Sequence, residues 1–211
     1  HGNRGRTLWQ ARCYAVSAYN NTGFTPDATG LHVNRWGVGL PILISAFIGT
    51  LGFPVVLNLV QCARRHLSPK RWTLHTKLTL VTTAVLVATS LAWFLLVEWG
   101  NTGLFPADDP GMKMRRAMSA AVMPRSTGFD ISWVPEVTNE TKVFMSILMF
   151  IGAGSSSTAG GIRVTTFAVI LLICRAAFTG HRDVTVFRRR IPRRIQMTAV
   201  SVTTACFALV M

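Results

Sequence analysis

Acidic residues are scarce in this chain of 211 residues, which has eight Asp and Glu against 22 Lys and Arg. The acids lie far apart in loop-like segments, so the sequence offers neither paired carboxylates for acid–base catalysis nor a Ser/His/Asp arrangement. Cysteine and histidine are also few, and they have neither the spacing of metal ligands nor that of a disulfide framework. We assign them to packing or to solvated loops: Cys13, Cys62, Cys174, Cys206, His1, His32, His66, His75 and His181. The composition therefore argues against an enzyme, a resident metal and a covalently bound cofactor.

Long stretches without charge are the most prominent feature that the chain does have. Residues 38–60 and 78–97 contain no charged side chain, and each is long enough to supply the roughly 20 residues that cross a bilayer core of about 30 Å. Residues 143–174 form a third, interrupted segment, and a fourth begins at residue 195. These segments predict an all-α integral membrane protein that crosses the cell membrane several times. Because the chain has no initiating Met and stops inside a hydrophobic run, we expect it to be a piece of a larger protein.

The third segment has a polar, glycine-rich interruption at its centre. Between residues 143–151 and 162–173 lie ten residues with four glycines and four hydroxyl side chains. Such a composition makes a poor helix, and at membrane depth non-helical backbone persists only where protein buries it or it lines a water-filled cavity. An unbroken helix over 143–174 would also be about 48 Å long, too long for one span. Because transporters and channels use broken helices to present carbonyls to ions, the segment predicts transport of a small polar solute.

Most of the basic residues lie in two loops. The loops 63–77 and 175–194 hold five and seven of the 22 Lys and Arg but a single acid, Asp183. The other seven acids lie in the remaining segments, on the opposite side if the spans alternate. An excess of Lys and Arg in short loops marks the cytoplasmic side of a membrane protein, so both loops are predicted to be cytoplasmic. Arg188, Arg189 and Arg190 either only set this orientation or also hold anionic membrane lipid or a cytoplasmic partner.

Two segments on the opposite, outer side share one pattern. Residues 8–24 and 112–129 each contain a short Ala- and Ser-rich helix candidate that ends in Thr-Gly-Phe. For the second, Asp109 can cap the helix and Pro110 can begin it. Each is too short and too polar to span a membrane, and each precedes a long apolar segment. The order predicts repeated helix–pore loop–helix units, one of them with a broken transmembrane helix. A single Thr-Gly-Phe is typical of a tight turn, whereas two in the same setting favour an ion filter.

The two Thr-Gly-Phe segments suit a filter for a monovalent cation. A re-entrant helix that ends at mid-membrane directs its partially negative C-terminal end at the pore centre. The strand that follows can turn its carbonyls inward and replace the hydration shell of an ion. Such a strand requires dihedrals that favour glycine, which makes Gly23 and Gly128 the central candidates. Further carbonyls and hydroxyls would come from Asn20, Asn21, Thr22, Arg125, Ser126 and Thr127, and Phe24 and Phe129 would wedge the strands against their surroundings.

These motifs resemble the Trk/Ktr/HKT superfamily of potassium transporters, in the form of its bacterial membrane subunits. Residues 17–24 are similar to the second pore loop of that family, and residues 124–129 are similar to the third. Residues 152–163 resemble the intramembrane gating loop that breaks the second helix of the third repeat, and this motif is the most specific of the three. Residues 153–156 depart from the Gly-Ser-Pro-Gly run that is common there, which leaves the conformation of the loop open.

The resemblance implies one chain of four repeats around a single pore, usually paired as a homodimer and regulated by a cytoplasmic nucleotide-binding subunit. It divides the sequence into part of repeat 2 (1–62), a cytoplasmic loop (63–77), repeat 3 (78–174), a second cytoplasmic loop (175–194) and the truncated first helix of repeat 4 (195–211). It assigns K⁺, the transported ion, to the backbone carbonyls of Thr22, Gly23, Thr127 and Gly128. It assigns gating to Gly152, Gly154, Ser155, Ser156, Ser157, Thr158, Gly160, Gly161 and Arg163. Because two filter strands are absent, the chain alone should not form a complete filter.

Several alternatives are left open by the same residues. A nucleotide-binding enzyme would explain a glycine-rich loop, but this loop lacks the Gly-Lys-Ser/Thr ending of a P-loop. A membrane scaffold or assembly subunit would use the glycines for helix packing, but it leaves two Thr-Gly-Phe segments unexplained. A sodium-permeable member of the same family is a further possibility, although both filters keep the glycine whose replacement by serine is associated with sodium permeation. Arg163 has two possible roles. In the first, its charge helps to repel cations when the loop is closed; in the second, its side chain reaches the cytoplasmic interface or bonds loop carbonyls.

Overall fold

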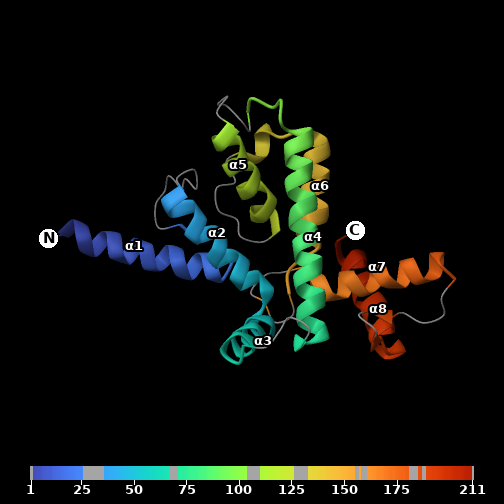
Figure 1. Cartoon of the computed structure of the whole chain (residues 1–211). Helices are drawn as coiled ribbons and strands as arrows, with labels where there is room; N and C mark the ends of the chain where they lie inside the picture. The colour runs from blue at the N-terminus through green and yellow to red at the C-terminus, as the bar shows by residue number, and fades with distance from the viewer. Residues whose placement is uncertain are drawn as a thin grey trace.

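Helices make up nearly all of the regular structure in the computed structural model of the chain (Figure 1). The structure describes residues 2–25, 36–66, 71–103, 110–125, 133–154, 157, 161–180, 185–186 and 189–210. The α-helices are α1 (Gly2–Tyr19), α2 (Trp36–Leu51), α3 (Phe53–Arg64), α4 (Leu74–Val97), α5 (Pro110–Val122), α6 (Asn139–Phe150), α7 (Val164–Phe178) and α8 (Arg193–Val210). The shorter elements are the 3₁₀ turns η2 (Met123–Arg125) and η3 (Val134–Glu136) and the strands β1 (Thr185–Val186) and β2 (Arg189–Arg190). The predicted all-α class is confirmed.

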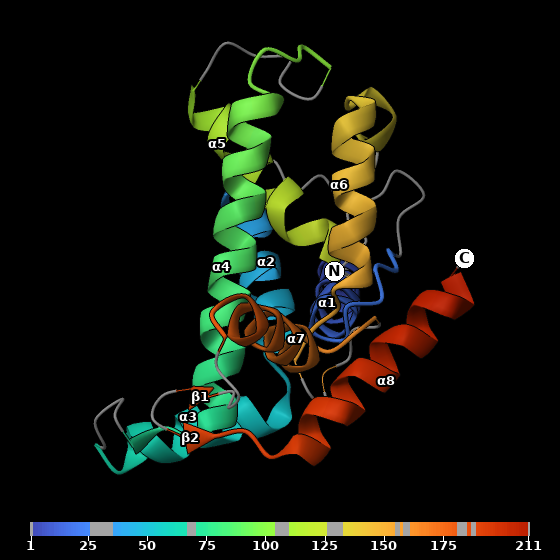
Figure 2. The same cartoon turned by 90° about the vertical axis from the view of Figure 1, so that its right-hand side faces the viewer.

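Helix α4 is the long upright element against which α2, α3, α5 and α7 pack (Figures 1 and 2). It begins where the Thr73 side chain accepts a hydrogen bond from the Thr76 N–H at 3.2 Å, which caps the helix. It runs for 24 residues, or about 36 Å. Within the described residues it is the one helix long and apolar enough to cross a membrane, and the bent pair α2–α3 is a second if it counts as one span. The span predicted over 78–97 therefore lies within one helix.

The span predicted over 38–60 is broken, so the expectation of one continuous segment there is wrong. Helix α2 ends at Leu51, α3 begins at Phe53, and the pair is bent by 102°. Gly52 between them has a φ of 85°, in the left-handed region that favours glycine. Pro54 follows in the first turn of α3, and because proline has no N–H, an unbroken helix through it would lose a hydrogen bond. Glycine and proline together therefore end α2.

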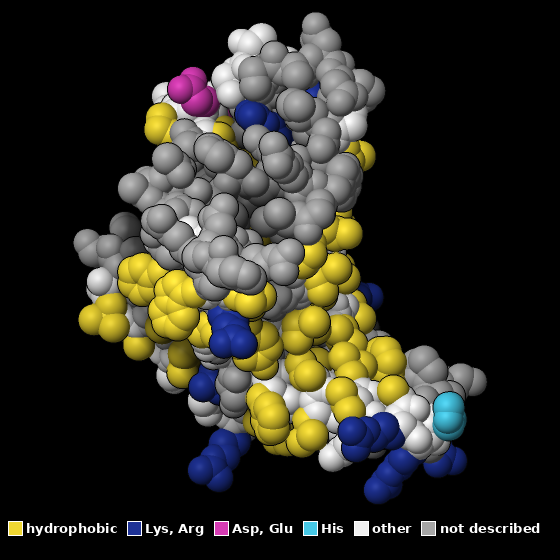
Figure 3. Space-filling view, turned by 90° about the vertical axis from the view of Figure 1, so that its left-hand side faces the viewer, with side chains coloured by type: hydrophobic (Ala, Val, Ile, Leu, Met, Phe, Trp, Pro, Cys, Tyr) yellow, Lys and Arg dark blue, Asp and Glu magenta, His cyan; other side chains and the backbone are white. Residues whose placement is uncertain are grey.

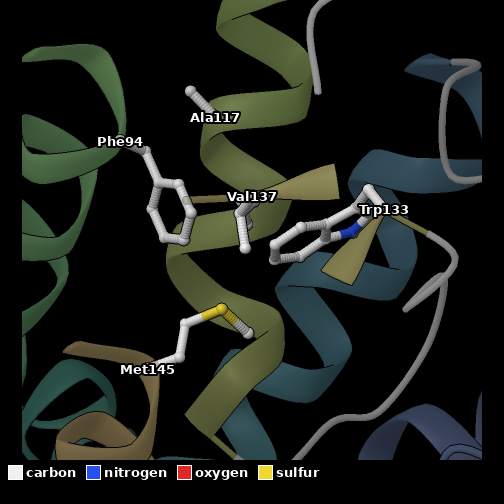
Figure 4. Packing of buried hydrophobic residues seen from close by; sticks show 6 residues of the cluster. Phe94, Ala117, Trp133, Val137 and Met145 are labelled. Carbon is white, nitrogen blue, oxygen red and sulfur yellow. The ribbon is translucent and has the colours of Figure 1, made fainter. Parts of the chain in front are cut away.

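A hydrophobic core joins α4 to α5 and α6 (Figure 4). Phe94 of α4 is fully buried and meets Trp133 edge to face, with ring centroids 5.8 Å apart. Ala117 of α5, Met145 of α6 and Val137 complete the contact surface around the two rings. The predicted pore helix α5 is therefore packed against the helix before it and the helix after it, as a helix–pore loop–helix unit requires.

Several basic side chains lie at one end of the molecule. On the face seen in Figure 3, some described Lys and Arg side chains lie below a band of hydrophobic side chains, at the level that α3 has in Figure 1, and others lie within or above that band. The two predicted basic loops are shorter than expected, because α3 continues to Arg64 and α7 continues to Phe178. The second loop contains an antiparallel pair in which Thr185 lies opposite Arg190. The assignment of this end to the cytoplasm stays a prediction.

Replacing Phe94 with Ala should lower the free energy of unfolding of the full-length protein that contains this sequence. We expect a loss of about 3 kcal/mol, because the change leaves a cavity where a ring was fully buried. Leu96→Ala, on the same helix but at a side chain that is 82% exposed, is the control and should have a much smaller effect. Chemical denaturation in detergent micelles measures both. Equal losses would show that this cluster does not hold α5 in place.

Candidate ion filter and gating loop

The first Thr-Gly-Phe segment leaves the end of α1 in a tight, hydrogen-bonded turn. After Tyr19 the chain has two residues with positive φ, Asn21 at 53° and Gly23 at 72°. The Thr22 N–H donates to the Ser17 carbonyl oxygen at 3.1 Å, and the two hydroxyl oxygens of Ser17 and Thr22 also lie 3.1 Å apart. Gly23 thus has the left-handed backbone for which glycine is suited, while its contact with an ion stays a prediction.

This turn packs against α2 at Gly49. A Cβ atom at Gly49 would lie 2.1 Å from the Tyr19 carbonyl oxygen and 2.9 Å from Asn21 Nδ2, so only glycine permits the approach. Asn21 is buried, and its Nδ2 lies 3.4 Å from the Tyr19 carbonyl oxygen and 3.5 Å from that of Ala46. The sequence alone did not identify Gly49 as part of the site, because a glycine in an apolar run has the appearance of an ordinary span residue.

The predicted role of Phe24 as a wedge stays a prediction, because the described residues of this chain do not cover its ring. Its side chain is 79% exposed. The contacts that fix the segment come from residues before Gly23: Asn20 Nδ2 donates to the Val16 carbonyl oxygen at 2.9 Å, and Asn21 and Thr22 bond as described above. The described part of the chain therefore holds the turn from its α1 side and leaves the Phe24 ring uncovered.

The second predicted filter segment follows α5. Helix α5 begins at Pro110, as predicted, and its chain continues through the turn η2. Asp109, Ser126, Thr127, Gly128, Phe129 and the side chain of Arg125 lie outside the described residues. Met123, in η2, packs in one buried cluster with Ala18 of α1 and Ile42 of α2. The fold thus brings together the C-terminal ends of the two predicted pore helices, which are far apart in the sequence.

The predicted gating loop is closed at its base by backbone hydrogen bonds. Helix α6 ends at Phe150 and α7 begins at Val164, so the predicted interruption of the helix is confirmed. Ile151 and Ile162 form a parallel bridge. The Gly152 N–H donates to the Ile162 carbonyl oxygen at 2.9 Å, and the Ile162 N–H donates to the Phe150 carbonyl oxygen at 2.9 Å. These hydrogen bonds therefore bring the end of α6 and the start of α7 together at the base of the loop.

Part of the predicted gating set lies within the described residues. Gly152, Gly154, Ser157, Gly161 and Arg163 are described, whereas Ser155, Ser156, Thr158 and Gly160 are not. Gly161 has a φ of 84°, and a Cβ atom there would lie 2.9 Å from both Gly152 N and the Phe150 carbonyl oxygen. The loop closes at its base because residue 161 is glycine.

The loop is bonded to α2 next to the residues against which the predicted filter segment packs. The Gly154 N–H donates to the Thr50 carbonyl oxygen at 2.8 Å, and a Cβ atom at Gly154 would lie 2.2 Å from the Leu51 carbonyl oxygen. The filter segment contacts Ala46 and Gly49, which precede these residues on the same helix. We call residues 46–51 the α2 platform, because this short stretch carries both the predicted filter segment and the start of the predicted gating loop.

Arg163 stands between the gating loop and α7. It is the N-cap residue of α7, and its side chain is exposed. It lies near enough to His75, in the first turn of α4, for the two charges to interact. Because the first turn of α4 lies within the predicted cytoplasmic loop 63–77, this position supports the interpretation in which the Arg163 side chain reaches the cytoplasmic interface.

A buried carboxylate joins the ends of α4 and α6 that lie away from the basic loops. Glu98 is fully buried, and its Oε1 accepts hydrogen bonds from the Thr138 N–H at 3.1 Å and the Thr138 hydroxyl at 2.7 Å. Its Oε2 accepts from Asn101 Nδ2 at 2.6 Å. Thr138 is the N-cap of α6, so the carboxylate lies at a helix end that favours negative charge. Burial by itself would raise the pKa of Glu98, but hydrogen bonds from Thr141, Thr138 and Asn101 outweigh burial and hold that pKa below its ordinary value.

Comparison with known proteins matches almost the whole chain to one family. The family model described as TrkH, cation transport protein, matches residues 2–211. The Ktr system potassium uptake protein B of Bacillus subtilis is 37% identical over 200 residues, which are 93% of this chain and 44% of that protein. The potassium/sodium uptake protein NtpJ of Enterococcus hirae is 29% identical over 196 residues, which are 92% of this chain and 42% of that protein.

A solved structure has the same fold. The crystal structure of the potassium transporter TrkH from Vibrio parahaemolyticus superposes with a TM-score of 0.75 at 16% sequence identity. The match covers 92% of this chain and 42% of that one. The chain thus spans less than half of the length of the relatives it matches.

Glu98 should make stability depend on pH in a defined direction. Because its pKa is lower in the folded protein, its contribution is fully present above the ordinary value of 4.5 and is lost as the pH falls through the folded value. Glu98→Gln should therefore lower the free energy of unfolding by about 2 kcal/mol at neutral pH, and the difference from the unmodified protein should shrink below pH 4.5.

Denaturation of the full-length protein in detergent across this pH range measures the effect. Glu140→Gln, which removes an exposed carboxylate from the first turn of α6, is the matched control. A Glu98→Gln difference that stays constant on acidification would show that the Glu98 charge does not hold the two helix ends together.

Proposed function

The chain belongs to the TrkH family of cation transport proteins, and on that premise we propose that it takes part in potassium uptake across the cell membrane. The ion would pass a carbonyl-lined filter that a glycine-rich intramembrane loop gates. The observation that carries the proposal is the α2 platform, where the Thr-Gly-Phe segment and the glycine-rich loop are held on neighbouring residues. A filter and a gate must lie close together for the gate to control the ion that leaves the filter.

The ends of the pore helices provide the electrostatics for a cation. Ala18 near the end of α1 and Met123 just after α5 meet in one cluster, so the partially negative C-terminal ends of both helices converge. Gly23, which has a positive φ, lies four residues after the end of α1. Carbonyls of Thr22 and Gly23, with those of Thr127 and Gly128, would replace water around a dehydrated K⁺.

The gating role of the loop rests on its small residues and on its attachment. Glycine at 154 and 161 lets the loop pack directly on neighbouring backbone, while the base stays closed by the bridge between Ile151 and Ile162. A loop that is closed at its base and bonded to α2 through Gly154 can shift as a unit. Arg163 lies at its exit, on the side of α4 that faces the basic loops.

Sodium permeation is the second candidate, since one relative is named a potassium/sodium uptake protein. Glycine at both predicted filter positions favours potassium. Two further expectations are part of the proposal: the complete pore needs the remainder of a longer chain, and that chain pairs as a homodimer in membrane lipid under a cytoplasmic nucleotide-binding subunit. Both follow from the family resemblance described above.

Rubidium uptake in cells that lack potassium uptake tests the proposal. The full-length protein should restore uptake, and the 211-residue fragment alone should not. Gly23→Asp should reduce uptake about tenfold or more at equal membrane expression, because a side chain at this φ costs about 1–3 kcal/mol and a carboxylate would bind the ion too firmly.

Gly180→Asp is the matched control, since Gly180 has a φ of 69° but open space around it. It carries the same backbone strain away from the predicted filter and should leave uptake unchanged. A well-expressed full-length protein without uptake, even with its cytoplasmic partner supplied, would favour the scaffold alternative. Normal uptake by Gly23→Asp would remove Gly23 from the filter.

A further inference from the structure

A groove with a volume of about 430 Å³ lies where the beginnings of α4, α7 and α8 come together. This volume falls within the roughly 300–1,000 Å³ that is usual for sites that bind small molecules. Helix α7 packs against both α4 and α8, as Figure 2 shows. Val169, Ile191 and Ala199 line the groove and form a buried hydrophobic cluster. The fold therefore provides a pocket whose shape is set by packed side chains.

The groove lies at the end of α4 that overlaps the predicted cytoplasmic loop 63–77. On this helix it is lined by Leu74, His75 and Leu78, in the first turns of the one described helix that is long and apolar enough to cross a membrane. Lipid headgroups occupy that level of a bilayer, and the hydrocarbon core begins next to it. A ligand in the groove would therefore have one part among the headgroups and another part in hydrocarbon.

The lining of the groove changes from basic to apolar along α8. One face of this helix forms the wall, through Arg194, Ile195, Thr198, Ala199 and Val202. Arg194 lies in the first turn, and Val202 lies about 12 Å further along the helix axis. Ile195 and Val202 are 51% and 44% exposed, so the described residues leave much of this wall uncovered. The groove thus has a charged end and an apolar end, as an amphiphilic ligand requires.

The charged end of the groove suits a negatively charged group. Arg194 and His75 line it, and no Asp or Glu is found among the described residues that line the groove. Arg163 adds a third basic side chain, because it lies near enough to His75 for the two charges to interact. The N-terminal ends of α4, α7 and α8 also meet here, and each carries a partial positive charge. A phosphate group has the charge that complements these groups.

We propose that the groove binds an anionic phospholipid of the predicted cytoplasmic leaflet, with its phosphate at Arg194 and His75 and one acyl chain on the apolar wall. An arginine side chain binds phosphate through charge-assisted hydrogen bonds that are often bidentate. The His75 ring has at least one N–H donor in either charge state. Basic pockets between membrane helices on the cytoplasmic side are typical sites for acidic headgroups. The site uses other residues than Arg188, Arg189 and Arg190, and it goes beyond the proposed transport function.

Arg194→Gln in the full-length protein tests the headgroup contact. Native mass spectrometry of the detergent-solubilised protein measures the binding of phosphatidylglycerol and of phosphatidylcholine with the same acyl chains. The unmodified protein should bind phosphatidylglycerol about tenfold more tightly, and Arg194→Gln should remove most of this preference, because it deletes a charge-assisted hydrogen bond. Arg193→Gln is the matched control, since Arg193 precedes Arg194 in α8, is also exposed and does not line the groove. It should keep the preference.

Thr198→Trp tests the acyl-chain contact. Thr198 lines the groove, so an indole ring there should take the place of the acyl chain and weaken the binding of phosphatidylglycerol about tenfold. Met197→Trp is the control, because Met197 is the preceding residue, is 67% exposed and does not line the groove. Glycerol phosphate, which has the charge of the headgroup but no acyl chain, should not displace the lipid at equal concentration. This comparison separates a lipid site from a site for free phosphate.

These measurements record lipid binding alone, so their outcome does not depend on which ion the protein carries. Equal binding of the two lipids, or equal losses in Arg194→Gln and Arg193→Gln, would overturn the site, because attraction of lipid to any basic surface would then be sufficient. Unchanged binding in Thr198→Trp would show that the lipid does not enter the groove and that another segment of the longer chain covers it. Displacement by glycerol phosphate would refute a lipid ligand.

Discussion

Backbone polar groups that leave a helix inside a membrane must find hydrogen bonds within the protein, because hydrocarbon offers none. Each interruption of this chain meets that constraint in a different way. The turn after α1 bonds back to its own helix through Thr22 and Ser17, the glycine-rich loop pairs with itself at Ile151 and Ile162, and the broken α2 offers its free carbonyl at Thr50 to that loop. The interruptions are thereby bonded to one another, and the resulting contacts place the predicted filter beside the predicted gate.

Close backbone approach is the second condition, and glycine meets it at each junction. Gly49 admits the end of α1, and Gly154 admits the end of α2, at distances that any Cβ would prevent. A membrane protein gains little from hydrophobic attraction between its helices, since lipid is equally apolar, so contact of this kind carries more of the association. Gly49 and Gly154 therefore have a structural requirement for glycine, because the backbone of another segment lies against each of them.

The two ends of the helix pair α4 and α6 are held by different kinds of contact. At the end away from the basic loops, Glu98 makes several hydrogen bonds while fully buried, and the aromatic contact of Phe94 with Trp133 lies one turn below it. At the other end, the Gly154 N–H bonds the Thr50 carbonyl of α2, and Leu86 of α4 packs with Ile151 and Val164.

Much of this organisation follows from local sequence. Composition and spacing are enough to predict several features: the uncharged runs, the polar interruption after residue 151, the two basic loops and the helix ahead of each Thr-Gly-Phe. The break of α2 at Gly52 and Pro54 was missed, because the uncharged run over 38–60 outweighed two local signals.

Tertiary structure alone decided which distant groups meet. The ends of α1 and α5 converge on Met123, Glu98 joins the N-terminus of α6, and Thr50 accepts the N–H of Gly154. None of these pairings leaves a periodic or compositional trace, since each joins ordinary residues from separate elements. The sequence by itself determined that helices must end at these positions, because glycine and proline act on their own backbone. Which partner satisfies each freed carbonyl or carboxylate depended on how the separate helices pack in space.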